Sequence, residues 1–127
     1  MPELAEVEYY RQQWDPGLGG RVEAVRLHRD KRIFRGTQPE FLSKALSGTF
    51  LRRSEAHGKQ MLFHFSGGHW LGLHLGMTGQ LRVEKPGFEP GKHDHLVLFQ
   101  ELRVLVFSDP RQFGRVRFHV GSQPPLW

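Results

Sequence analysis

The sequence predicts an α+β fold, a β-sandwich of about eight mostly antiparallel strands with an N-terminal helix and a second short helix packed at its edge. Two observations lead to this prediction. Short apolar or alternating segments follow one another from Thr49 to Val120, separated by glycine- and proline-containing turns. Helical patterns occur only before Thr49. The chain has 127 residues, 38% of them hydrophobic, so a single domain over residues 1–127 can bury a core.

The first element expected is a helix over residues 3–14. Leu4, Val7 and Trp14 fall near one face of this helix, and Arg11, Gln12 and Gln13 offer polar positions. The segment 15–20 contains one proline and three glycines, which end the helix.

A strand and a second, shorter helix are expected next. The apolar residues Val22, Val25 and Leu27 predict the first strand. Residues 37–40, Thr-Gln-Pro-Glu, match a capping box with proline near the helix start. The helix is expected to continue to about Leu46, with Gly48 as its stop.

From Thr49 onward β structure is expected, in short runs bounded by turn residues. The clearest runs are Met61–Phe65, Trp70–Leu75, Gln80–Val83, Leu96–Phe99, Val104–Phe107 and Val116–Val120. The final segment, 121–127, contains two prolines and is typical of a linker.

Composition limits the possible functions. There is no cysteine, which excludes disulfides and thiolate-bound zinc within this chain. No run of 18 apolar residues and no secretory signal pattern occurs, so a cytoplasmic location without membrane association is expected. The formal net charge of +5 favours a polyanionic partner, and nucleic acid is the commonest one.

The N-terminus combines an amine and a carboxylate. If Met1 is removed, Pro2 becomes a free secondary amine beside Glu3. Such an amine attacks an electrophilic sugar carbon to form an iminium ion, while the carboxyl group moves the protons. An α-amino group has a pKa near ~8, so an appreciable fraction is neutral at neutral pH, unlike a lysine near ~10.4. The alternative is that Pro2 only begins a helix, where its missing N–H is harmless.

Two glycine-containing segments carry further candidates. Lys59 follows Gly58 at a strand start, where it could hold a phosphate or transfer protons; the alternative is a solvated turn lysine. Met77 lies on a glycine-rich turn and could wedge between bases, whereas methionine more often fills a core. His74, three residues earlier, could reach a phosphate or be half-buried.

A third segment is His93-Asp94-His95. No third ligand lies nearby at metal-ligand spacing, so a metal site is not predicted. On a strand the two histidines would share one face and Asp94 would point away. Phosphate contact or packing on the sheet surface is therefore expected.

The segment 109–114 joins two expected strands. Arg111 and Phe113 would project from a loop that Pro110 and Gly114 constrain. An arginine for base edges and a phenylalanine for stacking suit an opened duplex. The alternative is an ordinary hairpin loop.

Taken together, the order and spacing of these segments resemble a known family. They are Pro2–Glu8, Gly58–Lys59, His74–Gly79, His93–His95, Asp109–Gly114 and Pro125–Leu126. The chain resembles the N-terminal domain of the formamidopyrimidine-DNA glycosylase and endonuclease VIII family over nearly all of residues 1–126.

The resemblance implies base-excision repair by a DNA glycosylase and AP lyase, which removes oxidised bases and cuts the backbone by β,δ-elimination. Pro2 would be the Schiff-base nucleophile and Glu3 the proton donor and acceptor. Lys59 would contact phosphate and assist elimination, and Glu6 would help to position the helix. The DNA-binding residues implied are His74, Met77, His93, Arg111 and Phe113.

The resemblance also implies the partners. Damaged double-stranded DNA is the expected partner of a monomer, associated with the nucleoid if the source is bacterial. No cofactor is expected in this chain, because the structural zinc of many family members belongs to a finger in the second domain. That domain, with its helix–two-turns–helix unit, is expected to lie outside residues 1–127.

The sequence also departs from the family at the N-terminus, and it leaves open both the substrate branch and functions other than catalysis. Ala5 stands where the family has proline, and a retained Met1 would turn the Pro2 nitrogen into an unreactive amide. Met77 and the Arg111/Phe113 pair are similar to the formamidopyrimidine branch, whereas residues 55–59 are closer to endonuclease VIII. A DNA-binding domain without catalysis, or a β-sandwich interaction module with incidental charge, remain alternatives to an enzyme.

Overall fold

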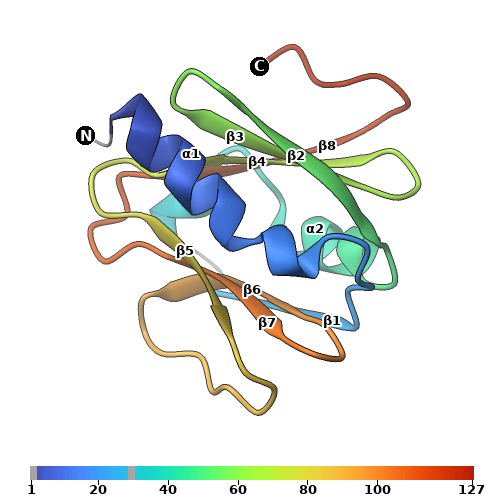
Figure 1. Cartoon of the computed structure of the whole chain (residues 1–127). Coiled ribbons are helices and arrows are strands. Elements are labelled where there is room, and N and C mark those ends of the chain that lie inside the picture. The colour runs from blue at the N-terminus through green and yellow to red at the C-terminus, as the bar shows by residue number, and fades with distance from the viewer. Residues whose placement is uncertain (1–2, 29–30) are drawn as a thin grey trace.

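The computed structural model describes residues 3–28 and 31–127 and confirms the expected α+β sandwich. Within these residues, eight strands form two four-stranded sheets in which all neighbours pair antiparallel (Figure 1). Two α-helices and two short 3₁₀ helices complete the described part of the chain. No helix in residues 3–28 and 31–127 is long and apolar enough to cross a membrane.

The first sheet has the strand order β1–β6–β7–β5. Its strands are β1 (Ala24–Leu27), β6 (Asp94–Phe99), β7 (Val104–Ser108) and β5 (Gln80–Glu84). The burial of nearly every residue of β6 and β7 explains why these two segments are almost continuously apolar.

The second sheet has the order β2–β3–β4–β8. Its strands are β2 (Leu51–His57), β3 (Gln60–Phe65), β4 (His69–His74) and β8 (Arg115–Val120). In β3 the buried and half-buried residues alternate, so one face of this sheet covers the core and the other faces outward. The chain crosses between the two sheets from β1 to β2, and again through the loops that join β4 to β5 and β7 to β8.

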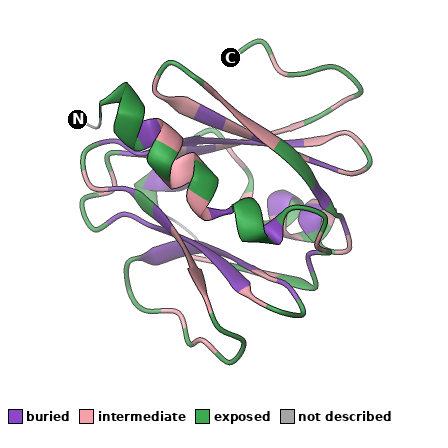
Figure 2. Ribbon diagram, viewed as in Figure 1, coloured by how far each residue is buried: buried purple, intermediate pink, exposed green. Residues whose placement is uncertain are grey.

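The helix α1 (Leu4–Gln13) closes one side of the sandwich, between the edge strands β2 and β5 (Figure 1). Val7 and Trp14 are buried as expected, and the Trp14 indole donates a hydrogen bond to the Val106 carbonyl (3.3 Å). Leu4, in contrast, is 60% exposed. The first turn of α1 is exposed, and packing against the sheets begins only at Val7 (Figure 2).

The opposite side of the sandwich is closed by α2 (Pro39–Leu46), which contacts β1, and by the 3₁₀ helix η2 (Arg32–Phe34), which contacts β8. Pro39 begins α2 as expected. The expected capping box is wrong: Gln38 is the N-cap, without a side-chain cap, and the Thr37 hydroxyl donates instead to the Val116 carbonyl (2.9 Å). Thr37 thus joins the start of α2 to β8.

The core lies between the two sheets and under both helices (Figure 2). Its largest fully buried side chains are aromatic, namely Trp14, Phe63, Phe65 and Phe107. Trp14 packs on Phe63 with ring centroids 4.8 Å apart and hydrogen-bonds to β7, so one side chain contacts both sheets. The remaining 3₁₀ helix, η1 (Asp15–Gly17), directly follows α1.

Candidate nucleic-acid interface and catalytic site

The loop that joins β4 to β5 lies against the loop that joins β7 to β8. The Thr78 hydroxyl donates to Asp109 Oδ1 (2.6 Å) and accepts from the Arg111 backbone N–H (3.2 Å). At Gly76 the backbones are so close that a Cβ would lie 2.4 Å from the Phe113 carbonyl carbon. Gly76 also has a φ of +62°, which disfavours any side chain. Segments 75–79 and 109–114 therefore form one rigid unit, called here the paired loops.

Asp109 organises the second of the paired loops from a fully buried position. Its Oδ2 accepts a hydrogen bond from the Gly114 N–H (2.8 Å), and its backbone carbonyl accepts one from the Gln112 N–H (3.3 Å). Gln112 adopts a φ of 56°, which is uncommon for a residue with a side chain. This tight conformation makes Arg111 and Phe113 project away from the core.

Three of the predicted DNA-binding side chains are exposed on the paired loops. Met77 is 50% exposed and Phe113 is 43% exposed, and Arg111 is also exposed. The Arg111 guanidinium carbon lies 4.8 Å from the centre of the Phe113 ring, a cation–π distance. Large apolar groups held in water on a rigid support indicate a binding function.

Lys59 and His74 lie beside each other at the adjacent end of the second sheet. Lys59 is half-buried in the turn between β2 and β3, and its neighbour Gln60 pairs with His74 across β3 and β4. Burial lowers the pKa of His74, and the charges of Lys59, Arg117 and Arg35 lower it further. His74 is therefore neutral at neutral pH.

The hydrogen bonding of His74 determines which of its nitrogens is free. Its Nδ1 accepts a hydrogen bond from the Gly76 N–H (3.0 Å). The proton of the neutral ring is then on Nε2, which remains available as a donor. A neutral donor beside a lysine is suited to contact a phosphate oxygen.

The expectation that His93 and His95 share one face, with Asp94 pointing away, is wrong. His93 is exposed, whereas Asp94 and His95 are 7% and 1% exposed. The pairing of β6 with β7 shifts between Asp94 and Leu96, and this bulge breaks the alternation. Asp94 accepts hydrogen bonds from Arg82 (3.0 Å) and from the Gly91 N–H (2.7 Å).

His93 alone of this segment is exposed beside the paired loops. Its carbonyl accepts a hydrogen bond from the Asp109 N–H (3.0 Å), which joins it to the second of those loops. Within residues 3–28 and 31–127, no three His, Asp or Glu residues gather as they would around a metal ion. The donors of a zinc site are thus not found in the described part of the chain.

His95 supports the paired loops from inside. Its Nε2 lies 3.0 Å from the Asp109 carbonyl, and its Nδ1 lies 3.2 Å from Nδ1 of His28. Because a carbonyl only accepts, the His95 proton is on Nε2 and its Nδ1 accepts from His28. This arrangement requires a neutral His95.

The free energy of unfolding is expected to fall as the pH drops below about 6.5, with His95 as one cause. Burial lowers the pKa of His95, with His28 and Lys31 acting in the same direction and Asp109 opposing them. The unfolded chain then binds more protons than the folded one, so acid favours unfolding. Burial also lowers the pKa values of His64 and His74, which act in the same direction.

Urea unfolding of the wild type and of the His95→Gln variant, between about pH 7 and 5, measures this contribution. Glutamine keeps a donor for the Asp109 carbonyl but does not titrate. Its free energy of unfolding should depend less steeply on pH than that of the wild type. Parallel curves for the two proteins would contradict the role of His95.

The two acidic candidates at the N-terminus are both exposed. Glu3 has extended backbone angles and is the N-cap of α1, and its carbonyl accepts hydrogen bonds from the Glu6 and Val7 N–H groups (2.9 and 3.0 Å). Glu6 lies in the first turn of α1. Pro2 lies outside the described residues. Figure 1 shows the start of α1 at the same side of the molecule as the loop that joins β4 to β5.

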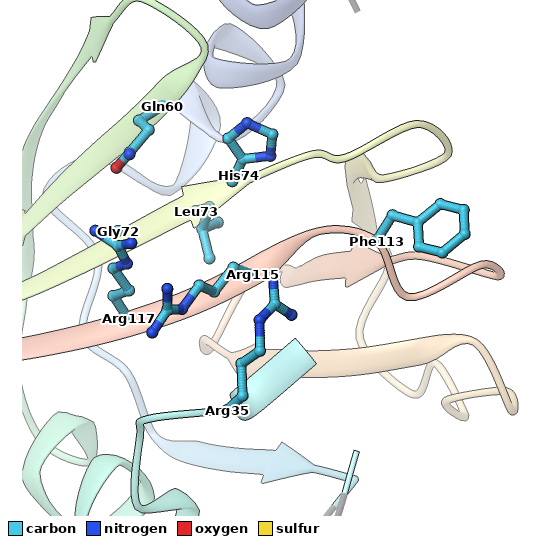
Figure 3. Close-up of a pocket in the computed structure, with 8 residues that line it drawn as sticks. All are labelled: Arg35, Gln60, Gly72, Leu73, His74, Phe113, Arg115 and Arg117. Atoms are coloured by element: carbon cyan, nitrogen blue, oxygen red, sulfur yellow. The ribbon is translucent and has the colours of Figure 1, made fainter. Parts of the chain in front are cut away.

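Three arginines at the site were not among the predicted residues. Arg35, Arg115 and Arg117 line a pocket of about 190 Å³, together with Gln60, Gly72, Leu73, His74 and Phe113 (Figure 3). Arg115 and Arg117 alternate along β8, a pattern that places both on one face and is visible in the sequence. Arg35 follows η2 and joins them only through the fold.

The family model described as the formamidopyrimidine-DNA glycosylase N-terminal domain matches residues 1–116. The chain belongs to this family. It is 38% identical over 123 residues to a formamidopyrimidine-DNA glycosylase of Herminiimonas arsenicoxydans, an alignment that covers 97% of this chain and 44% of that protein. A formamidopyrimidine-DNA glycosylase of Geobacter metallireducens is 43% identical over 118 residues. That alignment covers 91% of this chain and 43% of the length of the relative.

Solved structures agree with this assignment. The Fpg protein of Lactococcus lactis, in a complex with DNA containing N7-benzyl-Fapy-dG, superposes with a TM-score of 0.85 at 28% identity, over 94% of this chain and 44% of that one. The complex of the same protein with abasic-site DNA gives a TM-score of 0.86, over 96% of this chain and 45% of that one. The chain thus spans less than half the length of the relatives that it matches, and the predicted resemblance to the family is confirmed.

Proposed function

We propose that this chain is the catalytic and DNA-binding domain of a base-excision repair enzyme, a DNA glycosylase and AP lyase that acts on oxidised bases. One observation carries the proposal: the paired loops hold Met77, Arg111 and Phe113 exposed on a rigid support, in a chain that belongs to this glycosylase family. Such a support can fill the space left when a damaged nucleotide is flipped out of the duplex.

The proposed chemistry begins at the sugar. The lone pair of the Pro2 nitrogen attacks C1′ as the bond from C1′ to the damaged base breaks, and the base leaves with those electrons and takes up a proton from water. The Glu3 carboxylate accepts the proton of the Pro2 nitrogen and passes it to the ring oxygen O4′; the ring opens, and an iminium ion joins Pro2 to C1′. The exposed position of Glu3 at the N-cap of α1 leaves its carboxyl group free to approach the sugar.

Strand cleavage follows from the iminium ion. Loss of a proton from C2′ expels the 3′ phosphate, and a second elimination expels the 5′ phosphate. Lys59 and the Nε2–H of His74 would hold these phosphates, and Glu6 would keep the first turn of α1 in place. Each step uses an amine, a carboxyl group or a hydrogen-bond donor of this chain, so we propose that the reaction needs no cofactor.

The proposed substrate is double-stranded DNA that contains an oxidised purine of the formamidopyrimidine kind. Relatives carry that name, and the Lactococcus lactis protein has been solved with Fapy-dG DNA. The same protein has also been solved with DNA containing an oxidised pyrimidine. An oxidised pyrimidine is therefore the alternative substrate. We propose that the protein acts as a monomer on the DNA of a bacterial cytoplasm.

A Glu3→Gln variant tests the proposed roles. Glutamine cannot donate the proton needed for sugar ring opening, so excision of the damaged base should fall by about 10²–10⁴-fold. Cleavage of a preformed abasic site begins with an aldehyde and should fall much less. Denaturing gels of duplexes that contain either lesion measure both rates. An equal loss on the two substrates would contradict the role of Glu3.

The second candidate function is DNA binding without catalysis, which the exposed loops and the arginine-lined pocket would support by themselves. Binding would then decrease steeply with salt, because each neutralised phosphate releases counterions. Salt-dependent binding combined with no base excision and no covalent adduct would favour this candidate over the enzyme.

A further inference from the structure

The arginine-lined pocket lies on the outward face of the second sheet, at the edge formed by β8. In the register of β4 and β8, Arg117 pairs with Gly72 and Arg115 pairs with His74. Gly72 itself has no side chain beside Arg117. Figure 3 shows the Arg35 side chain rising toward β8 from the neighbouring segment.

Neutral groups lie against the guanidinium groups of Arg35 and Arg115. Arg35 donates to the carbonyls of Arg32 and Gly114 (both 3.1 Å). The guanidinium of Arg115 lies against Gly36, where a Cβ would be 2.9 Å from its terminal nitrogen. The Arg115 Nε is buried and has no hydrogen-bond partner in the described part of the chain.

The pocket concentrates positive charge. Burial lowers the pKa of Arg35, and the charges of Arg115, Arg32 and Arg117 lower it further. Every charged group among these causes is another arginine. Arginines that repel one another and leave a buried donor unpaired are destabilising unless an anion is bound. Planar guanidinium groups match the paired oxygens of a phosphate.

We propose that Arg35, Arg115 and Arg117 bind one phosphodiester group of the DNA strand, next to the phosphates expected at Lys59 and His74. This inference rests on the proposed function and adds a contact that the predicted site residues do not include. His74 and Phe113 also line the pocket, and Phe113 belongs to the paired loops that would enter the duplex. A backbone phosphate is therefore favoured over a free anion.

The Trp127 side chain lies next to the pocket. The Trp127 ring lies over Gly72, where a Cβ would be 2.2 Å from it, and the Arg117 guanidinium carbon is 5.5 Å from the ring centre. Trp127 stacks on one face of Arg117 and leaves its N–H edge for the phosphate. The Gly72 position thus allows an aromatic ring and a cation to lie flat on the sheet.

The salt dependence of DNA binding tests the inference. Fluorescence anisotropy would give the dissociation constant of an abasic-site duplex between about 50 and 200 mM salt. In the Arg115→Gln/Arg117→Gln variant, binding at low salt should weaken about tenfold, and the slope of log K against log salt should decrease by about 1. The matched control is Arg26→Gln/Arg103→Gln, which removes the same charge outside the pocket.

A second variant and a stability measurement distinguish a loss of charge from a loss of arginine geometry or of folding. An Arg115→Lys/Arg117→Lys variant keeps the charge and should keep the slope while binding severalfold more weakly, because lysine lacks the bidentate geometry. Thermal unfolding establishes that each variant is folded. A pocket variant that keeps the slope of the control would overturn the inference. If the wild type still binds DNA and excises the damaged base in that case, the proposed function stands and only the inference fails.

Inorganic phosphate serves as the probe for a free-anion site. If it raises the unfolding temperature of the wild type but not of the glutamine variant, and the DNA slope is unchanged, the pocket binds a small anion and the DNA assignment is wrong. If the wild type binds no DNA at low salt, the proposed function and this inference both fail.

Discussion

A protein that keeps a residue in front of Pro2 is expected to form no covalent adduct with abasic-site DNA. The nitrogen of Pro2 is then an amide, whose lone pair is delocalised into the carbonyl and does not attack C1′. The effect should be complete, because no other group of the chain is proposed to replace this nucleophile. Borohydride reduction of the iminium ion, followed by intact-mass measurement, detects the adduct.

The control uses the same chain with Met1 removed, verified by mass before the reaction. It should give an adduct, and Glu3→Gln should still give one with abasic-site DNA. Mass mapping would locate the modified residue. An adduct of equal yield in the blocked protein, for example on Lys59, would show that Pro2 is not the nucleophile.

Replacement of Gly76 by alanine is expected to have the largest effect on the paired loops. A side chain at a φ of +62° costs about 1 kcal/mol or more. The added Cβ would also lie 2.4 Å from the Phe113 carbonyl carbon and 2.5 Å from the Gly114 nitrogen, both of them backbone atoms that cannot rotate away. Relief of this overlap adds about 1–3 kcal/mol, so the loops should separate and the free energy of unfolding should fall by ~3 kcal/mol.

Gly58→Ala is the matched control. Gly58 has a φ of +60°, and a Cβ there meets nothing within 4 Å, so this variant isolates the backbone cost of about 1 kcal/mol. Urea unfolding gives the difference between the two variants, which measures the contact between the paired loops. Equal losses of stability would show that the loops do not depend on their close approach.

Activity should follow the same contact. Gly76→Ala should reduce base excision strongly, because Met77 and Phe113 would no longer project together. Gly87→Ala serves as a control in a turn outside the site, with a φ of +90° and open space around it. Full activity in Gly76→Ala, despite lost stability, would contradict the proposed role of the paired loops.

Much of the fold was predictable because it depends on local patterns. Alternation in β3 and the apolar runs of β6 and β7 identify strands wherever they pack, and Pro39 indicates a helix start by its own geometry. The errors occurred where a partner far along the chain intervened. Thr37 donates to Val116 in β8 instead of capping α2, and a bulge against β7 turns His95 inward.

The candidate site divides in the same way. Met77, Arg111 and Phe113 were identifiable as exposed residues because glycine and proline flank them in the sequence. Arg35 was not, because nothing around it in the chain indicates that it meets Arg115 and Arg117. Its hydrogen bond to the Gly114 carbonyl spans 79 positions, and only the packing of η2 on β8 brings the two segments together.

The sequence alone thus determines the kinds of element in this protein, the chemistry on its turns and its family. Those properties follow from side-chain periodicity, backbone restriction at glycine and proline, and the order of short motifs. The tertiary structure decides which turns meet. Of the passages of the chain from one sheet to the other, those at β4–β5 and at β7–β8 place Thr78 on Asp109, 31 residues away. Long-range antiparallel pairing sets that contact, and no local pattern records it.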